Sequence, residues 1–263
     1  MYELQLTTDK GITYLTSPEL QEKSIFVAFT TKHTGFSATP YDSLNLAFHV
    51  GDNSKQVLKN RRHVAELFDF DIGRLTCAQQ VHGATARFID AKDAGKGVYG
   101  YETAIKDTDG LATDIGGVTL GMFFADCLPV VLVSPEPRVV AIAHAGHKGL
   151  FSGVIEQLIK KVSEKTEPKR MLAFLGPAIG PCCYEVDESR INQFSQKFPR
   201  AVKKTDTSLD LKKIAASVLL REGLASENIY KSSFCTCCNN DLFFSYRRNS
   251  TTGRQAAIAF IKG

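Results

Sequence analysis

The sequence predicts a mixed α/β fold, with a central mixed β-sheet, or more than one, flanked by helices. Short apolar runs rich in β-forming residues are separated by polar or proline-containing turns, and other segments carry apolar residues at helical spacing. One strand–helix–strand succession, over residues 139–175, implies a right-handed crossover if its two strands are parallel in one sheet. No internal repeat, low-complexity tract or linker interrupts the chain, so we expect residues 1–263 to form a single domain.

The expected elements follow in chain order. Strands are predicted over residues 24–30, 118–124, 129–133, 139–143, 171–175, 242–246 and 256–261. Helices are predicted over residues 54–68, 149–161, 188–198 and 211–220. The first helix is the best defined, because Gly51-Asp52-Asn53 offers a turn and an N-cap directly before it.

Composition and charge argue against a disordered or fibrous protein and against a nucleic-acid-binding one. The apolar fraction of 43% and charged fraction of 23% are those of an ordinary globular protein. The net charge is only +4, and the densest basic run, residues 160–170, is interleaved with Glu164 and Glu167. This run is typical of a solvated helix face, so we expect no nucleic-acid partner.

Hydropathy and cysteine usage suggest a cytoplasmic protein. No apolar stretch approaches the roughly 20 residues that span a bilayer, and residues 1–10 lack the pattern of a signal peptide. The seven cysteines are an odd number, and several are neighbours that rarely bridge each other. We therefore expect reduced thiols, a reducing compartment and no membrane association.

Reactive side chains lie where the predicted strands end, which is where α/β sheets bind ligands. His82 follows a further possible strand, Asp126 and Cys127 lie between two apolar strands, and His144 and His147 follow the next strand. Two imidazoles and one thiolate, from His82, His144 and Cys127, form a three-ligand set suited to catalytic zinc. Their spacings of 45 and 17 residues match no compact metal motif, so buried structural histidines and cysteine remain the alternative.

Two further features have more than one interpretation. Arg61 lies on the buried stripe of the first helix and should have an anionic partner, either a carboxylate or a ligand.

A C-x-x-C motif is formed within Cys235, Cys237 and Cys238, but no second one follows to complete a four-cysteine knuckle. The adjacent Cys182 and Cys183 are too closely spaced to serve as half of such a knuckle. These five are expected to be reduced thiols near the core or a pocket rim.

Motifs over most of the chain resemble those of the laccase-domain family, also described as YfiH/YlmD-like or polyphenol-oxidase-like. They are Ser43-Leu44-Asn45-Leu46, Gly51-Asp52, Val57 with Asn60-Arg61, Gln80-Val81-His82-Gly83, Asp109-Gly110-Leu111, Ala125-Asp126-Cys127-Leu128-Pro129, Ala143-His144-Ala145-Gly146, the run from Gly176 to Val186, Cys235-Thr236, Phe244-Ser245-Tyr246-Arg247-Arg248 and Thr252-Gly253-Arg254. Each motif is weak alone, but their common order makes the resemblance specific.

The resemblance implies a single YfiH-like α/β domain in which His82, Cys127 and His144 bind zinc. It also implies phosphorolysis of purine nucleosides (adenosine, inosine, guanosine and methylthioadenosine) to base and ribose 1-phosphate, with deamination of adenosine in the same pocket. The expected partners are thus a purine nucleoside and phosphate. The family's usual Ala-Gly-Trp-Arg-Gly is here Ala145-Gly146-His147-Lys148-Gly149, so substrate preference could differ.

The resemblance also suggests roles for side chains around the ligands. Arg61 is the candidate for phosphate, with Asn45 as a neutral donor nearby. Asp126 could carry a proton or support a ligating histidine, and His147 could contact substrate or act as a further base. His82, Cys127, His144 and Asp126 are therefore the expected catalytic residues.

Three rival functions remain open at the level of sequence. A copper polyphenol oxidase would also use two histidines and a cysteine, but it needs further histidine-bound copper ions, and the chain has six histidines and no His-x-His. A cysteine hydrolase, such as a peptidoglycan-precursor editing amidase, would use Cys127 activated by His144, with His82 or Asp126 orienting the base. A non-catalytic binding protein would keep the fold without needing the ligands.

Overall fold

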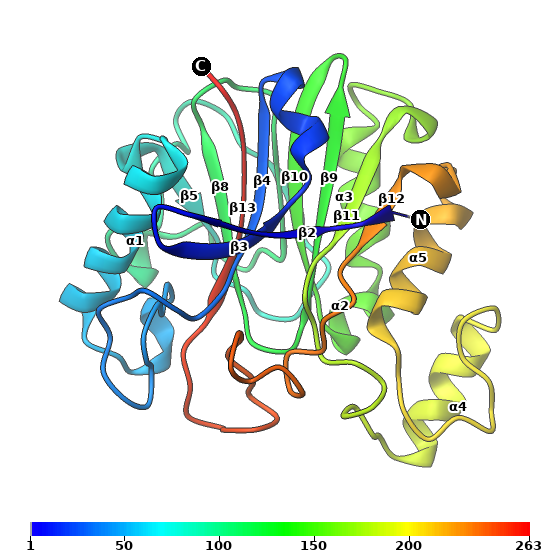
Figure 1. The fold of residues 1–263 in the computed structure, drawn as a ribbon. Coiled ribbons are helices and arrows are strands. Elements are labelled where there is room, and N and C mark those ends of the chain that lie inside the picture. The colour runs from blue at the N-terminus through cyan, green and yellow to red at the C-terminus, as the bar shows by residue number, and fades with distance from the viewer. Residues whose placement is uncertain (1) are drawn as a thin grey trace.

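Two β-sheets pack face to face, and helices cover their outer faces (Figure 1). The computed structural model describes residues 2–263, apart from the side chains of residues 2, 3, 21 and 22. The first sheet has the order β1 (Tyr2–Glu3), β12 (Ile229–Lys231), β11 (Leu172–Leu175), β9 (Leu128–Pro135), β10 (Arg138–Ala145), β7 (Gly110–Thr113) and β6 (Ala86–Phe88). The second has the order β2 (Gln5–Asp9), β3 (Ile12–Thr16), β4 (Ile25–Thr30), β13 (Gln255–Ile261), β8 (Thr119–Phe124) and β5 (Leu75–Cys77).

Strand β9 shows how the layers are built from sequence. Val131 and Val133 belong to the core between the two sheets, whereas Val130 and Leu132 belong to the core beneath the helices. Successive side chains of a strand point to opposite faces, and here both faces are buried. This is why the strand is a continuous apolar run rather than an alternating one.

Helices close each outer face. On the first sheet the helices are α2 (His147–Ser152), α3 (Val154–Val162), α4 (Glu188–Lys197) and α5 (Leu211–Arg221). Helix α1 (Ser54–Phe68) covers the second sheet, where Leu67 and Phe68 join a cluster with Phe26 and Phe260. Figure 1 shows α1 on one side of the two sheets and α3 and α5 on the other.

The predicted mixed α/β class is confirmed, and most element boundaries agree with the structure. Helix α1 has the predicted bounds, and the Asn53 side chain caps it by accepting from the Lys55 N–H. The strands flanking the predicted crossover, β10 and β11, both pair antiparallel with β9 and are therefore parallel to each other. The helix predicted over residues 149–161 is instead two helices, divided at Gly153, whose φ of 90° an α-helix cannot accommodate.

The strand predicted over residues 242–246 is wrong. Phe243 and Phe244 are buried, but the segment is irregular. The Gln255 side chain bonds both the N–H and the carbonyl of Phe244, at 2.9 and 3.2 Å, in place of a neighbouring strand. The apolar pattern of this segment therefore reflects the burial of its side chains and not the formation of a strand. The short strands β1, β2, β3, β6, β7 and β12 were not predicted, because their patterns are too brief to stand out, whereas β5 corresponds to the possible strand expected before His82.

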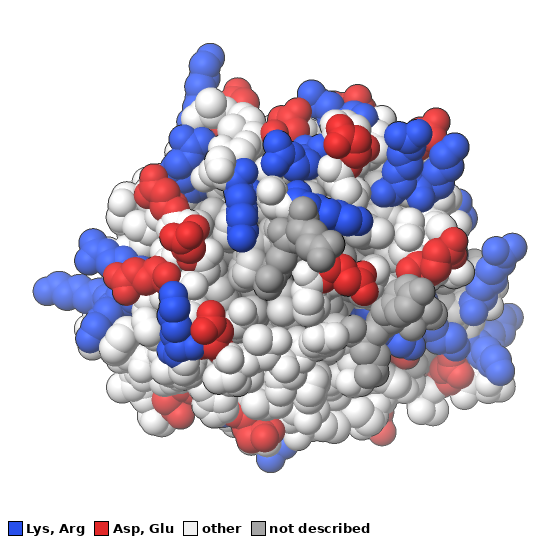
Figure 2. All heavy atoms as spheres, turned by 45° about the horizontal axis from the view of Figure 1, so that its top comes forward, with Lys and Arg blue, Asp and Glu red and all other residues white. Residues whose placement is uncertain are grey.

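Charge and helix length describe the outside of the molecule. On the face in Figure 2, the Lys and Arg side chains are interspersed with Asp and Glu. Within the part of the chain that the structure describes, no helix is long and apolar enough to cross a membrane.

Candidate active site and metal centre

The strand pairing brings the predicted ligands together. The end of β10 lies against the start of β9, with His144 opposite Pro129 and Ala145 opposite Leu128. Cys127 comes directly before β9, so it lies at the same edge as His144. The ligand atoms of His82, Cys127 and His144 all lie within 4.8 Å of one another. At least these three of the predicted site residues therefore form one cluster.

Asp109, which the sequence analysis did not assign a role, holds two of the three ligands in place. Its Oδ1 lies 2.8 Å from His144 Nδ1. The same carboxylate accepts the backbone N–H groups of Val81, His82 and Gly83, at 3.1, 3.0 and 2.7 Å. Because Nδ1 of His144 is engaged, its Nε2 remains for a metal, the usual arrangement in zinc sites.

Asp126, which we expected to share that supporting role, instead faces the other side of the site. Its Oδ1 accepts the Thr236 hydroxyl at 2.6 Å, and its Oδ2 accepts the Arg247 N–H at 2.6 Å. Asp126 has a φ of 87°, and His82 a φ of 61°, both in the left-handed region that non-glycine residues seldom adopt. Their hydrogen bonds hold two strained residues at the same site, a feature that concentrates at functional sites.

Cys127 and His144 form a charged pair. Burial opposes ionisation of the Cys127 thiol, but the His144 and His82 side chains lower its pKa to about 6. Burial likewise opposes protonation of His144, but the Cys127 thiolate and Asp109 raise its pKa to about 9. Around pH 7 the pair is therefore a thiolate and an imidazolium.

Gly146 allows the backbone after β10 to approach this pair. A Cβ at position 146 would lie 2.6 Å from Cys127 Sγ and 3.5 Å from His82 Cδ2. Real Cβ atoms do not come so close to sulfur, so any larger residue would displace the ligands. The turn thus depends on glycine for the space it leaves.

The three ligands open onto a pocket of about 530 Å³, within the usual range for small-molecule sites. It is lined by His49, Gln80, His82, Phe123, Ala125, Asp126, Cys127, His144, His147, Ile179, Tyr184, Leu211, Tyr246, Arg247 and Arg254. Three aromatic rings and two guanidinium groups therefore share the wall with the ligands. In Figure 1 this edge lies at the bottom, where the orange and red segments that follow β12 loop across.

His147 lies on the pocket wall and pairs with Tyr184. Its Nδ1 is 2.9 Å from the Tyr184 hydroxyl. Burial, with Arg190 and Lys148 nearby, lowers the pKa of His147 to about 4, and burial raises the pKa of Tyr184 to about 12. The pair is therefore neutral at pH 7.

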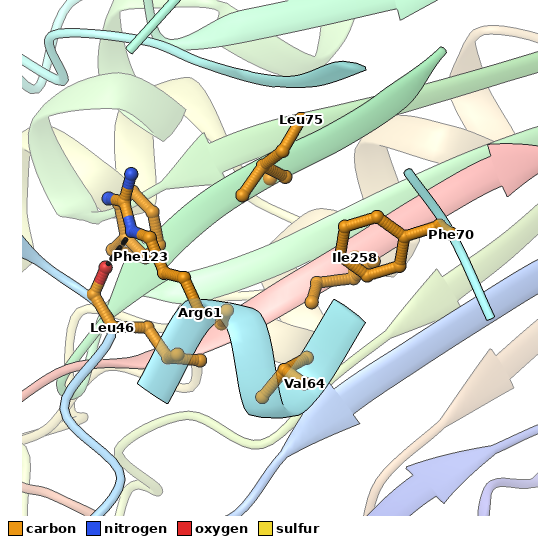
Figure 3. A pocket seen from close by; sticks show the side chains of 9 residues that line it. Leu46, Arg61, Val64, Phe70, Leu75, Phe123 and Ile258 are labelled. Atoms are coloured by element: carbon orange, nitrogen blue, oxygen red, sulfur yellow. Dashed lines mark hydrogen bonds between the residues drawn. The ribbon is translucent and has the colours of Figure 1, made fainter. Parts of the chain in front are cut away.

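Arg61 does not line this pocket. It lies beside a separate, small apolar cavity with Leu46 and Val64 (Figure 3). Its guanidinium donates to the carbonyls of Leu46, Gly97 and Val98 at 2.7 to 2.9 Å. It also lies over the Phe123 ring, at 4.6 Å from the centroid. The expected anionic partner is thus replaced by backbone carbonyls and an aromatic face, which satisfy the buried cation without a carboxylate.

Asn45 is also buried away from the pocket. Its amide donates to Ala47 O and Asp52 Oδ2, and its oxygen accepts the N–H groups of Ala47 and Arg254. Asn45 therefore positions the backbone of Arg254, a pocket residue, rather than facing a ligand itself.

The residues that sequence reasoning missed were visible only as motif members. Asp109, Tyr184, Tyr246, Arg247 and Arg254 all belong to the motifs quoted above, but nothing in their spacing indicated where they point. The histidines and the cysteine drew attention because their side chains bind metals well and are few in this chain. Arginines and aromatic residues are too common to do so.

The structure also corrects the interpretation of the other cysteines. Cys182, Cys183, Cys235 and Cys238 have sulfur atoms that all lie within 4.8 Å of one another. The expectation that these residues lack partners for a four-cysteine site was therefore wrong, although all seven cysteines are free thiols as predicted.

Comparison with known proteins places the chain in a family. The family model described as multi-copper polyphenol oxidoreductase laccase matches residues 26–262. The chain belongs to this laccase family. The purine nucleoside phosphorylase YlmD of Geobacillus stearothermophilus is 40% identical over 239 residues, 87% of each protein. The purine nucleoside phosphorylase YfiH of Escherichia coli K12 is 35% identical over 250 residues, covering 92% of this chain and 96% of that protein.

Solved structures of the laccase family share the fold. The crystal structure of YlmD from Geobacillus stearothermophilus superposes with a TM-score of 0.91 at 36% identity, covering 98% of this chain and 99% of that one. A YfiH protein of Bacillus licheniformis gives a TM-score of 0.89 at 35% identity, over 95% and 96% of the two chains. The resemblance predicted from the motifs is confirmed.

Proposed function

We propose that the protein is a zinc-dependent purine nucleoside phosphorylase that also deaminates adenosine. One observation carries the proposal: His82, Cys127 and His144 converge beside a 530 Å³ pocket walled by aromatic rings and arginines. Relatives named purine nucleoside phosphorylase, at 35 to 40% identity, support the same activity.

The three ligands suit zinc. Two imidazoles and a thiolate are the donors that zinc prefers, and a three-residue set leaves one position for substrate or water. The Asp109 contact to His144 supplies the orienting carboxylate such sites carry. When bound, the ion would act as a Lewis acid at the pocket wall. Within the described residues, no other candidate ligand group contains a histidine, so the further copper sites of a multicopper oxidase have no ligands here.

Aromatic side chains give the purine base a place to bind. Phe123, Tyr184 and Tyr246 all line the pocket. A flat purine ring stacks on such faces whichever substituent it carries, which fits a site that accepts several nucleosides. The neutral Tyr184–His147 pair can hydrogen-bond a ring nitrogen without introducing charge. His147 stands where the family usually has tryptophan. We therefore expect this pair to make the substrate preference of the protein differ from that of its family.

Arg247 and Arg254 take the phosphate role first proposed for Arg61. Both line the pocket, whereas the Arg61 guanidinium is engaged by carbonyls outside it. Each pocket arginine is held by its own carbonyl contacts, Arg247 to Cys183 and Arg254 to Thr252 and Gly253. A fixed guanidinium is a strong ligand for phosphate oxygens because its donors match their geometry.

The remaining groups assist bond cleavage. In phosphorolysis an oxygen of hydrogen phosphate attacks C1′ of the ribose, the C1′–N9 bond breaks, and the departing base takes up the proton that the phosphate releases. Positive charge develops on the sugar, and the Asp126 carboxylate lies in the same pocket to stabilise it. Its contacts with Thr236 and Arg247 fix the carboxylate before substrate arrives.

The proposal is tested with zinc-loaded protein incubated with inosine or adenosine, with and without phosphate, and the products separated by chromatography. We expect free base and ribose 1-phosphate only with phosphate, and neither from His82→Ala. Arg254→Ala should raise the KM for phosphate about tenfold or more, because a charged hydrogen bond is lost. Arg62→Ala, an exposed arginine on α1, is the matched control and should leave it unchanged. Folded, zinc-loaded protein that yields neither base nor inosine would contradict the proposal.

A cysteine hydrolase is the second candidate, and one observation favours it. Cys127, His144 and Asp109 are arranged as a triad of nucleophile, base and orienting carboxylate. The Cys127 thiol is already ionised by its neighbour His144. The orienting residue is Asp109, rather than the His82 or Asp126 expected from sequence. An amidase acting on peptidoglycan precursors would retain activity when metal is removed and lose it on alkylation of Cys127. The phosphorylase would lose activity with the metal.

A further inference from the structure

Four cysteines come together because two parallel strands end at the same edge. Strands β11 and β12 pair in parallel, and a bridge between Ala178 and Cys235 continues this pairing beyond their ends. The loop after β11 carries Cys182 and Cys183, and the loop after β12 carries Cys235 and Cys238. Segments more than 50 residues apart in sequence therefore place four sulfur atoms in one cluster.

The spacing of these sulfur atoms suits one tetrahedral ion. Cys238 Sγ lies 3.4 Å from Cys182 Sγ and 3.4 Å from Cys183 Sγ, and all four atoms lie within 4.8 Å of one another. Zinc–sulfur bonds of about 2.3 Å place tetrahedral ligands about 3.8 Å apart, so small adjustments close the set. Disulfide-bonded sulfurs would be about 2.05 Å apart.

A backbone N–H donor favours negative charge at the cluster, and two arginines hold its loops. The Gly180 N–H donates to Cys235 Sγ at 3.1 Å. Arg247 donates to the Cys183 carbonyl and Arg248 to the Cys237 carbonyl, at 2.9 and 3.3 Å. Four thiolates around a divalent cation carry a net charge of about −2, which N–H donors such as that of Gly180 stabilise.

We propose that Cys182, Cys183, Cys235 and Cys238 form a second metal site, a closed tetrathiolate that holds zinc. Four thiolates fill a tetrahedral ion and leave no position for substrate, so this site is structural, unlike the open three-ligand set. Soft thiolate ligands select zinc over magnesium or calcium. Cys237 lies outside the cluster although it is in the same loop.

The second site would fix part of the pocket wall. Tyr184 directly follows Cys183 and pairs with His147, while Thr236 directly follows Cys235 and bonds Asp126. One ion joining the two loops would therefore hold Tyr184 and Asp126 in register. This consequence for substrate rests on the proposed function, whereas the site itself does not.

Metal content of the full chain tests the site without any substrate. Protein purified with thiol reductant and zinc, then desalted, is measured by elemental mass spectrometry. We expect two zinc ions per chain for wild type and Cys237→Ser, and one for His82→Ala, Cys238→Ser and Cys182→Ser. With cobalt in place of zinc, His82→Ala should keep intense thiolate-to-cobalt charge-transfer absorption, and Cys238→Ser should lose most of it. Cys182 is exposed, so its variant serves if Cys238→Ser fails to fold.

Several results would overturn the proposal. One zinc per wild-type chain that disappears in His82→Ala shows that the cysteines hold no metal. A disulfide between Cys238 and Cys182 or Cys183 in the metal-loaded protein, detected by peptide mass spectrometry, has the same meaning. Iron and acid-labile sulfide in the cluster would refute zinc as its metal. If two zinc ions are present but no nucleoside is converted, only the proposed function fails.

Discussion

At the scale of single residues, the site depends on one carboxylate that no titratable-residue pattern singled out. Asp109 is fully buried and satisfies three successive backbone N–H groups as well as His144. A carboxylate has enough lone pairs for all four contacts, whereas an amide has fewer and adds unmatched donors. Asp109 thus couples the shape of the loop before β6 to the orientation of the His144 ring.

Asp109→Asn should therefore weaken zinc binding at the three-ligand site about 10- to 100-fold. Competition with a fluorescent chelator measures the affinity, using protein that also carries Cys238→Ser so that only one site is read. Asp107→Asn is the control, because Asp107 is exposed and its left-handed φ of 47° is tolerated by asparagine. An unchanged affinity in Asp109→Asn would show that the carboxylate only supports the loop.

The pH dependence of Cys127 reports the pair with His144. The pKa of this thiol is lowered to about 6 in the folded protein, so its thiolate persists down to that pH and is lost below it. In chelator-treated protein, iodoacetamide should therefore modify Cys127 with a midpoint near pH 6, read by peptide mass spectrometry. His144→Ala removes the imidazolium while burial remains, so its midpoint should move upward by more than one pH unit. Zinc loading should protect Cys127 at every pH. A wild-type midpoint above pH 8 contradicts the charged pair.

At the scale of elements, the turn from β10 into α2 sets the space around the ligands. Gly146 has a φ of −68°, which any residue adopts, so its requirement is steric rather than conformational. The parallel pairing of β11 with β12 likewise decides which loops meet on the far side of the pocket. Strand ends and the short turns beyond them, at one edge of the sheet, carry the chemistry.

Gly146→Ala should lower zinc affinity at the three-ligand site at least about tenfold with little loss of helix content. The added methyl group would meet Cys127 Sγ at 2.6 Å, and the thiol must move to relieve the contact. Chelator competition and circular dichroism measure the two effects. Gly116→Ala is the control, since its Cβ would meet only ordinary contacts at 3.6 Å. If both variants bind zinc like wild type, the close approach has no role in metal binding.

At the scale of the whole molecule, the two sheets share one core. Val131, Ile142 and Phe174 from the first sheet join Phe29 and Met122 from the second in a single buried cluster. Neither sheet could separate without exposing that apolar surface to water. We therefore propose that residues 1–263 unfold as one domain.

Urea denaturation of zinc-saturated protein should give one transition, coincident by tyrosine fluorescence and far-ultraviolet circular dichroism. The chain has eight tyrosines and no tryptophan, so tyrosine is the fluorescent probe. Phe174→Ala, at the inter-sheet face of β11, should lower the free energy of unfolding by about 3–5 kcal/mol in both signals. Phe36→Ala, which is 39% exposed, should change it by less than about 1 kcal/mol. Two separate transitions would divide the chain into independent units.

Much of the fold was predictable from local sequence. Helix α1 has the bounds given by its cap and apolar stripe, and β8, β9, β10, β11 and β13 lie where apolar β-forming runs predicted them. These elements are encoded by nearest neighbours along the chain. The grouping of His82, Cys127 and His144 was also predicted, because histidine and cysteine at strand ends are few enough to single out.

Tertiary structure alone decided which side chains meet. It gave the supporting role to Asp109 rather than Asp126, enclosed Arg61 among carbonyls, and joined cysteines from two loops. These contacts link residues tens of positions apart in the chain, through strand pairings whose order the local pattern does not specify. Sequence periodicity records which face of an element is buried. It does not record what lies against that face, which is set by packing among elements distant in the chain.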